Sequence, residues 1–530
     1  MTVELYDTTL RDGAQMEGLS LSVEDKLKIA ARLDELGVHF IEGGWPGSNP
    51  KDAEFFVRAQ SLNLQHARLA AFGSTRRAGG QADADANLRA LLDARTPVVT
   101  LVGKAHEMHV RDVLETSLEE NLAMIADSVR FVAGQGRTVF FDAEHFFDGF
   151  YADRRYAIAC LKAAASASAQ CLVLCDTNGG MTTQRIVDAI RAVQEELPGS
   201  ALGIHTHNDA DLAVANTLAA VDLGVRQVQA CVNGYGERCG NANLMSVIAN
   251  LKLKLGIDVI SDEQLRLLTD VSLYVSEIVN LVPDPYQPYV GSSAFTHKGG
   301  LHTAAVLKND RTYQHVPPEV VGNQQRMVVS ELGGSSGLIE KLKQVGFEFE
   351  VSRDAAREIQ REINNLEAMG YSFEGADASL YLLARRHRSD YVAPFELDSY
   401  RTVERALSAT SRHNREIESE AIAKVIVNGE ALQEVAEGNG PVSALDAAVR
   451  KALVKFHPSV TAIRLIDFKV RIIDSAAGAN AAVRVLIEST DGHHVWTTVG
   501  ASTDIIEASW LALSDSLEYF LVKRAGSAPG

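Results

Sequence analysis

The stretch ALGIHTHNDADLAVANTLAAVDLG (201–224) joins a short apolar run to a polar turn and a helical pattern. Its first seven residues predict a buried strand, and the apolar residues after the turn recur at the spacing of a helix face. His205 and His207 stand two residues apart at the end of that strand. The stretch therefore predicts a strand-then-helix unit with polar side chains at the carboxyl end of its strand.

The same unit recurs through the first 255 residues. Candidate strands lie at 3–7, 40–44, 67–72, 98–102, 138–144, 171–175, 201–207 and 227–232. Helical patterns separate them, and eight such units in this length are typical of a (β/α)8 TIM barrel. A doubly wound open sheet is the alternative, but no GxGxxG motif follows the first strand. We therefore predict an α/β protein whose residues 1–260 form a TIM barrel.

The pattern changes after residue 260. Residues 261–419 predict small helical subdomains, including a proline-rich crossing segment, and 375–417 is expected to be helical. Residues 420–523 contain strand and helix patterns in the order β-α-β-β-β-α. We expect linking helical subdomains over 261–419 and a separate C-terminal α+β domain over 420–523.

Composition and charge exclude several classes of protein. With 530 residues, of which 46% are hydrophobic and 23% charged, the chain has the composition of a globular protein of two or three domains. A net charge of −18 argues against nucleic acid or an anionic membrane as a partner. The N-terminus is charged almost at once, no apolar run approaches the roughly 20 residues of a membrane span, and the five cysteines form no CxxC pair. We expect a reduced, cytoplasmic protein with buried free thiols.

Polar residues gather at the predicted carboxyl ends of the strands, where TIM-barrel active sites lie. They occur in DTTLRDGAQ (7–15), DAEHF (142–146), DTNGG (176–180), HTHND (205–209) and NGYGERCGN (233–241). Because strand side chains alternate faces, His205 and His207 point the same way, and both imidazoles can reach one metal ion. An HxH pair is often only a polar loop, but the convergence of carboxylates, amides and an arginine favours a metal site.

Three of these motifs resemble those of a known family. LYDTTLRDGAQ (5–15), HTHNDADLAVANTLAAV (205–221) and VNGYGERCGNANL (232–244) are similar to the Claisen-condensing barrel family of 2-isopropylmalate, homocitrate and citramalate synthases. The relatives of this acyl-CoA-dependent family include 3-hydroxy-3-methylglutaryl-CoA lyase. The resemblance extends over the whole chain, and the stretches at 42–52, 294–322 and 494–510 are most similar to the longer citramalate synthase branch.

The resemblance implies a divalent metal ion held by Asp12, His205 and His207, with Asn241 as a further candidate ligand. Two imidazoles and one carboxylate with open positions suit a catalytic ion with room for substrate. Zinc, manganese and magnesium all remain possible. The alternative role for Asn241 is a helix N-cap before ANLMSVIANL (242–251).

The same resemblance assigns residues to the substrate. Arg11 would hold a carboxylate or stabilise a carbonyl oxygen that becomes an alkoxide, with a surface ion pair as the alternative. Thr177 resembles the hydroxyl that binds the carboxylate of a 2-oxo acid, although DTNGG would form a turn regardless. Gln15 and Glu42 are expected to shape the pocket.

The groups that move protons are also implied by the resemblance. Glu144, on the same strand face as Asp142, would orient groups or transfer protons beside the substrate; a buried pair with an arginine is the alternative. His302 and Tyr313 resemble residues by which the segment after the barrel completes an active site, that of a neighbouring subunit. An imidazole is a suitable base for the methyl proton of an acetyl thioester, and His297 is the rival of His302.

The implied reaction is condensation of the co-substrate acetyl-CoA with pyruvate, followed by thioester hydrolysis to citramalate and CoA. A synthase that uses another 2-oxo acid, a lyase of the same barrel family and a binding protein without turnover are the alternatives. The C-terminal domain resembles the feedback domains of the synthases, which implies a homodimer inhibited by the end product isoleucine. A dimerisation module without a ligand is the alternative, although the helix start at 441–453 leaves backbone N–H groups suited to a carboxylate.

Overall fold

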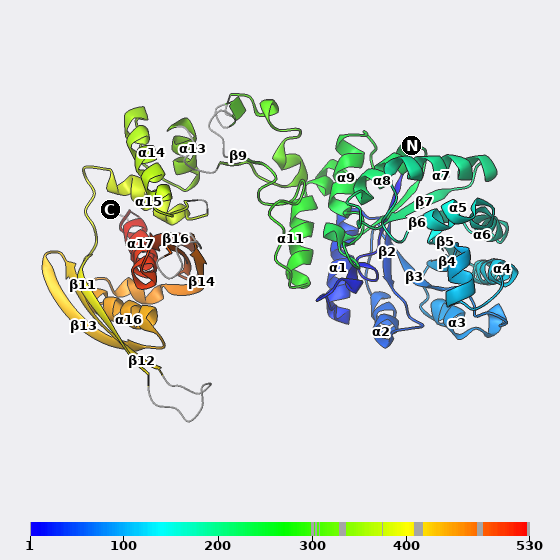
Figure 1. The fold of residues 1–530 in the computed structure, drawn as a ribbon, viewed down its shortest axis with the longest axis horizontal. Coiled ribbons are helices and arrows are strands. Elements are labelled where there is room, and N and C mark those ends of the chain that lie inside the picture. Colours follow the sequence, from blue (N-terminus) through cyan, green and yellow to red (C-terminus); the bar gives the residue numbers. More distant parts are fainter. Residues whose placement is uncertain are drawn as a thin grey trace. The chain divides into compact units, whose positions relative to one another are not determined.

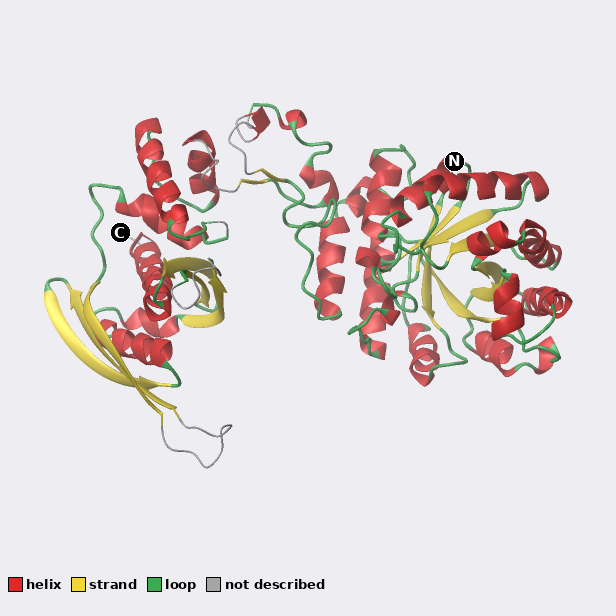
Figure 2. Ribbon diagram, in the orientation of Figure 1, coloured by secondary structure: helices red, strands yellow, loops and turns green. Residues whose placement is uncertain are grey.

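The computed structural model describes residues 2–297, 302, 305–306, 308–327, 335–373, 375–406, 417–473 and 481–526. The chain divides into two compact units, Met1–Phe295 with His315–Gln325 and Thr296–Gln314 with Arg326–Gly530. The first unit holds a barrel of strands surrounded by helices, and the second holds further helices, a short strand pair and two three-stranded sheets (Figures 1 and 2).

The first unit is built around a closed barrel of parallel strands in chain order. The strands are β1 (Glu4–Asp7), β2 (Phe40–Gly44), β3 (Arg68–Ser74), β4 (Val98–Lys104), β5 (Thr138–Glu144), β6 (Cys171–Asp176), β7 (Leu202–Thr206) and β8 (Gln227–Ala230). The predicted α/β class and (β/α)8 barrel are confirmed. Each predicted strand agrees with an observed one to within two residues at either end.

The first unit also contains helices, most of which surround the strands (Figure 1). They are α1 (Val23–Leu36), α2 (Pro50–Ala59), α3 (Ala86–Asp93), α4 (Leu118–Gly134), α5 (Phe146–Ala152), α6 (Arg154–Ser166), α7 (Thr183–Glu196), α8 (Ala213–Asp222), α9 (Leu244–Leu253), α10 (Asp262–Leu265) and α11 (Leu268–Ile278). In α1, Ser22 and Asp25 form a capping box, and Gly37 ends the helix at φ 89°. Ile29 and Leu33 on its inner face are fully buried, so local end signals and an apolar face act together.

Large side chains fill the inside of the barrel. Tyr6, Phe40 and Phe140 are buried there, with ring centroids 5.1 to 6.1 Å apart in tilted or edge-to-face arrangements. A larger apolar layer lies between the strands and the helices. The barrel is therefore a packed core rather than a pore, and its mouth is the place for a ligand.

The second unit contains a helical part. β9 (Thr296–His297) and β10 (Arg326–Met327) form a short parallel pair. The helices α13 (Ser335–Gln344), α14 (Arg353–Ala368) and α15 (Asp377–Arg386) share a core that includes Leu342, Ile363 and Leu380. Among the described residues, no helix combines the length and the apolar character needed to cross a bilayer.

Two three-stranded antiparallel sheets, each followed by a helix, form the rest of the second unit. The elements are β11 (Glu396–Ala406), β12 (Ile417–Val427), β13 (Glu430–Gly438), α16 (Pro441–Leu453), β14 (Arg464–Ile472), β15 (Val483–Thr490), β16 (Val495–Ser502) and α17 (Ile505–Gly526). The order β-α-β-β-β-α predicted for 420–523 is wrong, because the observed order there is β-β-α-β-β-β-α, and β11 precedes the predicted boundary. Residue 420 lies within β12.

The missed strands carry sequences that favour helices. The expectation that 375–417 is helical is met by α15 and is wrong for β11. β13 reads EALQEVAEG, yet exposed and half-buried positions alternate along it because it pairs with β12. Pairing with a neighbouring strand therefore overrides the local preference for a helix.

The cysteines are free thiols, as expected. Cys160, Cys171, Cys175 and Cys231 are buried, whereas Cys239 is exposed. The expectation of buried thiols is wrong for Cys239, which lies in the polar loop after β8.

Candidate active site

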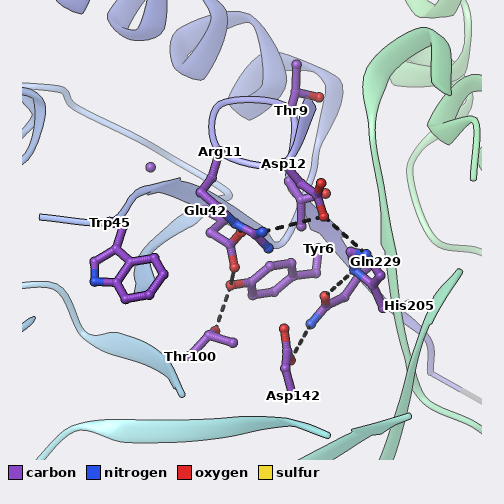
Figure 3. Close-up of polar contacts among 12 residues, drawn as sticks. Tyr6, Thr9, Arg11, Asp12, Glu42, Trp45, Thr100, Asp142, His205 and Gln229 are labelled. Atoms are coloured by element: carbon purple, nitrogen blue, oxygen red, sulfur yellow. Dashed lines mark hydrogen bonds and ion pairs between the residues drawn. The ribbon is translucent and has the colours of Figure 1, made fainter. Parts of the chain in front are cut away.

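Asp12, His205 and His207 meet at the mouth of the barrel; Figure 3 shows the first two. Asp12 follows β1 at the start of a 3-10 turn, His205 lies in β7 and His207 follows it. His205 Nε2 lies 3.2 Å from Asp12 Oδ2 and 3.3 Å from His207 Nε2, which is itself 3.9 Å from Asp12 Oδ2. Ligand atoms about 2.1 Å from one ion are roughly 3.0–3.5 Å apart. Two of the three separations lie in this range and the third is somewhat longer, so the set could hold one divalent ion.

The turn that carries Arg11 and Asp12 is held by the end of β1. Asp7 accepts hydrogen bonds from the Thr9 backbone N–H at 3.0 Å and from the Thr9 hydroxyl at 2.6 Å. The Thr9 hydroxyl oxygen also accepts from the Val232 N–H at 2.8 Å, which ties the turn to the end of β8. These bonds hold Asp12 at the barrel mouth.

The surroundings of Asp12 and His207 favour the protonation states that bind a metal ion, whereas Asp12, against the effect of burial, raises the pKa of His205. Burial alone favours a neutral carboxyl, but the Arg11 guanidinium and His205 hold the pKa of Asp12 well below its usual range. Burial, together with neighbouring His205, lowers the pKa of His207 to about 4 and keeps that imidazole neutral. A carboxylate and a neutral imidazole are the forms that bind divalent ions.

Asn241 lies beside His207, with which it forms an isolated β-bridge. Its Nδ2 donates to the Tyr235 carbonyl at 3.1 Å, whereas its Oδ1 is buried and has no hydrogen-bond partner among the described residues. The helix cap is Asn243, whose side chain accepts from the Met245 N–H at 3.0 Å. A buried amide oxygen of this kind suits a further ligand, so Asn241 stays a candidate.

Arg11 is held on several sides. Its Nε donates to Glu42 Oε1 at 2.5 Å, and its Nη1 lies 3.5 Å from Asp12 Oδ2. Its guanidinium lies 3.8 Å from the centroid of the Phe72 ring. Glu42 is fully buried and also accepts from the Tyr6 hydroxyl at 2.6 Å (Figure 3). Glu42 therefore orients Arg11 from beneath the mouth.

Glu144 ends β5 and forms an ion pair with Lys104 at the end of β4. Both side chains are partly buried and line the mouth. The partner considered from the sequence was an arginine, and Lys104 was not singled out. Which residue faces Glu144 depends on the register between two separate strands, which no local motif records.

Thr177 lies in the turn after β6, and its Oγ1 accepts a hydrogen bond from the His145 N–H at 2.8 Å. Because this oxygen already accepts, the hydroxyl proton is left to donate to a ligand. His145 has φ 58°, a left-handed conformation that is uncommon for a residue other than glycine. Arg238 donates to the Thr177 carbonyl at 2.8 Å and to Asp209 at 2.7 Å, which joins the loops after β6, β7 and β8.

One cavity of about 370 Å³ brings these side chains together. Of the residues selected from the sequence, those that line it are Arg11, Asp12, Gln15, Glu144, Thr177, His205 and His207. Residues without an assignment from the sequence also line it, namely Trp45, Phe72, Lys104, Asp142 and Arg238. Large aromatic residues at the ends of β2 and β3 were a signal that could have identified Trp45 and Phe72.

His302, Tyr313 and His297 belong to the second unit. The rings of His302 and Tyr313 lie 4.2 Å apart, and both side chains are exposed. Burial, followed by the charge of His302, lowers the pKa of His297, whose Nε2 lies 3.5 Å from Gln314 Nε2. The structure thus brings His302 and Tyr313 together, and their action in catalysis stays a proposal.

Known proteins match the chain along its length. A family model described as HMGL-like matches residues 2–275, a homocitrate synthase post-HMGL domain-like model matches 289–370, and a LeuA allosteric (dimerisation) domain model matches 374–521. The (R)-citramalate synthase of Aquifex aeolicus is 50% identical over 98% of this chain and 98% of its own. The chain belongs to the citramalate synthase and 2-isopropylmalate synthase family.

This family membership confirms the resemblance seen in the sequence motifs. The (R)-citramalate synthase of Geobacter sulfurreducens is 48% identical over 98% of each chain. The 2-isopropylmalate synthase of Methanocaldococcus jannaschii is 31% identical over 98% of this chain and 95% of its own. Within the family, the chain is thus more similar to these citramalate synthases than to this 2-isopropylmalate synthase.

Proposed function

We propose that the chain condenses acetyl-CoA with pyruvate and hydrolyses the thioester, which releases (R)-citramalate and CoA. The observation that carries this proposal is a single cavity that holds the ligand set Asp12, His205 and His207 together with Arg11 and Glu144. Its 50% identity to an (R)-citramalate synthase over nearly the whole chain supports the choice of substrates.

The mouth supplies groups that hold a 2-oxo acid. When bound, a divalent ion, whether zinc, manganese or magnesium, polarises the ketone and offsets negative charge that develops on its oxygen. Arg11 lines the same cavity with a guanidinium that Glu42 and Phe72 hold in place, and it can bind a carboxylate or a developing alkoxide there. Thr177 has a hydroxyl proton to donate to the substrate carboxylate.

The condensation also requires a base. The methyl group of acetyl-CoA loses a proton to give an enolate, whose carbon forms a bond to the ketone carbon of pyruvate. We assign the base to His302 with Tyr313, or to its rival His297, and we assign to Glu144 the orientation of groups and the transfer of protons. The ketone oxygen gains a proton, and water then cleaves the thioester to release CoA.

We propose that two aromatic side chains of the mouth favour pyruvate over bulkier 2-oxo acids. Trp45 and Phe72 line the cavity with ring centroids 5.6 Å apart, edge to face. Trp45 Nε1 donates to Asn87 Oδ1 at 2.6 Å, which fixes the indole, and Arg11 lies over the Phe72 ring. Rigid aromatic walls of this kind leave room for a small 2-oxo acid side chain.

The assembly and regulation belong to the same proposal. The match of residues 374–521 to an allosteric (dimerisation) domain supports a homodimer. We propose that isoleucine, the end product of a pathway that starts with citramalate, binds this domain and lowers the rate, and that the enzyme acts in the cytoplasm. We further propose 1–260, 261–419 and 420–523 as the catalytic, linking and regulatory segments.

The experiment is release of free thiol from acetyl-CoA by metal-loaded enzyme with pyruvate, 2-oxoisovalerate or 2-oxoglutarate, followed by mass spectrometry of the product. The expected result is the highest kcat/KM with pyruvate and a product with the mass of citramalate. A preference for 2-oxoisovalerate or 2-oxoglutarate would move the chain to a sister activity. Cleavage of citramalyl-CoA without condensation would favour a lyase.

A further inference from the structure

His205 and Gln229 are register partners on the neighbouring strands β7 and β8. Both side chains are buried, and His205 Nδ1 lies 2.8 Å from Gln229 Oε1 (Figure 3). The other ring nitrogen, Nε2, faces Asp12 and His207. Gln229 therefore contacts the proposed ligand His205 on the side of the ring away from the metal position.

The far end of the Gln229 amide determines which atom faces His205. Gln229 Nε2 donates to Asp142 Oδ1 at 3.0 Å and lies 3.4 Å from Gln227 Oε1. The structure directs the amide nitrogen of Gln229 toward these two oxygen atoms and its amide oxygen toward His205. Because an amide oxygen only accepts hydrogen bonds, His205 Nδ1 must carry the proton. The neutral ring then has its lone pair on Nε2, toward Asp12.

His207 has no equivalent support. Its Nδ1 is buried and makes no hydrogen bond within the part of the chain that the structure describes. The two proposed imidazole ligands thus differ, since only the ring of His205 is held by a side chain on the next strand. The barrel strands therefore hold the ring of His205 in one orientation, through Gln229 on β8.

We propose that Gln229 is a positioning residue, which holds His205 in the tautomer whose Nε2 binds the metal ion. Asp142 and Gln227 in turn hold the amide of Gln229. The inference rests on the metal site of the proposed function. Partners that hold the far nitrogen of a ligating histidine typically contribute 10- to 100-fold, as an order of magnitude, to metal affinity.

The test is the affinity of the full-length protein for Zn²⁺ and Mn²⁺, measured by competition with a chelating dye. Gln229→Met keeps the length of the side chain but removes the acceptor, so we expect binding to weaken by roughly 10- to 100-fold. Gln229→Glu combined with Asp142→Asn, whose amide can donate to the new carboxylate, keeps an acceptor toward His205 and should bind within about threefold of wild type. The d–d absorption of bound Co²⁺ should change in the methionine variant and be restored in the glutamate variant.

Gln194→Met is the matched control. Gln194 lies on α7, where its Nε2 donates to the Leu223 carbonyl at 2.6 Å, away from the proposed ligands. This variant loses one glutamine hydrogen bond in the same barrel and should bind metal as wild type does. If Gln229→Met unfolds, which circular dichroism would reveal, Gln229→Leu also lacks the acceptor and takes its place.

Three results would overturn the proposal in different ways. If folded Gln229→Met or Gln229→Leu binds metal as tightly as wild type, Gln229 only packs in the core and the metal site stands. If the glutamate variant is as weak as the methionine variant, the acceptor is not the cause. A wild-type protein that binds no divalent ion would remove the metal site itself, and the role of Gln229 with it.

Discussion

Lys104 and Glu144 are register partners on the neighbouring strands β4 and β5, and they form an ion pair at the barrel mouth. Glu144 also lies 4.0 Å from His145 Nε2. The main-chain N–H of the same histidine donates to Thr177. The lysine thus holds a carboxylate that lines the same cavity as Thr177, whose hydroxyl is proposed to bind substrate.

This relationship predicts that Lys104 acts through Glu144. Glu144→Gln should lower kcat by about 10²- to 10⁴-fold if the carboxylate moves protons. Lys104→Met should lower kcat by roughly 10- to 100-fold, because the carboxylate loses its fixed position. Lys104→Arg keeps the charge and should retain more activity than Lys104→Met. Equal activity of Lys104→Met and wild type would show that the ion pair has no part in turnover.

The metal site predicts a second set of results. Asp12→Ala and His205→Ala should abolish both turnover and metal binding, because each removes a ligand. The barrel core lies below the mouth, so circular dichroism should show an intact fold. The control is His66→Ala, which changes an exposed histidine and should keep full activity. Full activity of chelator-treated, metal-free wild type would contradict the site.

The aromatic walls predict a change in substrate preference. Each methylene accommodated in a pocket is worth about 1–3 kcal/mol, so wild type should favour pyruvate over 2-oxoisovalerate by at least tenfold in kcat/KM. Trp45→Ala enlarges the cavity and should narrow this ratio, mainly through a gain with 2-oxoisovalerate. An unchanged ratio in this variant would show that Trp45 does not contact the substrate side chain.

Asp142 predicts a pH-dependent stability. Burial, together with the charge of Glu42, raises the pKa of Asp142 from 3.8 to about 7. Between about pH 4 and pH 7 the Asp142 carboxyl therefore keeps its proton in the folded chain but loses it in the unfolded chain. The destabilisation of the fold by Asp142 grows over this range and reaches its full size above pH 7. Asp142→Asn should raise the Tm of metal-free protein by a few degrees at pH 8 and only slightly at pH 4.5. A change of about 1 kcal/mol in the free energy of unfolding corresponds to roughly 2–4 °C in Tm.

The comparison for Asp142 is Asp112→Asn, which changes an exposed carboxylate on the same unit. Its effect on Tm should be small and similar at both pH values. A gain for Asp142→Asn that is as large at pH 4.5 as at pH 8 would contradict the raised pKa of Asp142.

The match of residues 374–521 to an allosteric domain predicts that an amino acid regulates the rate. Isoleucine should lower the rate of the full-length enzyme and raise its Tm, because a ligand stabilises the state that binds it. Leucine serves as the matched amino acid. A chain that ends before residue 374 should lose the response, whereas a cut at residue 420 would divide β12. If isoleucine changes neither rate nor Tm, the regulatory proposal fails and the dimer is tested separately by sedimentation.

Local sequence was sufficient for much of this protein. The strand-then-helix repeat determined the barrel, because a buried parallel strand and an amphipathic helix each have their own periodicity. The segment that carries His205 and His207 placed both imidazoles on one face of one strand, and the turn after β1 placed Arg11 and Asp12 at the same end. These features depend on neighbours within a few residues.

Only the tertiary structure decided the features that depend on strand pairing. β13 has a helix-favouring sequence and becomes a strand because β12 offers it partners. Lys104 meets Glu144, and Gln229 meets His205, through the register of strands whose connections include whole helices. A shift of one residue would turn each of these side chains to the other face of the barrel, so their chemistry exists only once the barrel has closed.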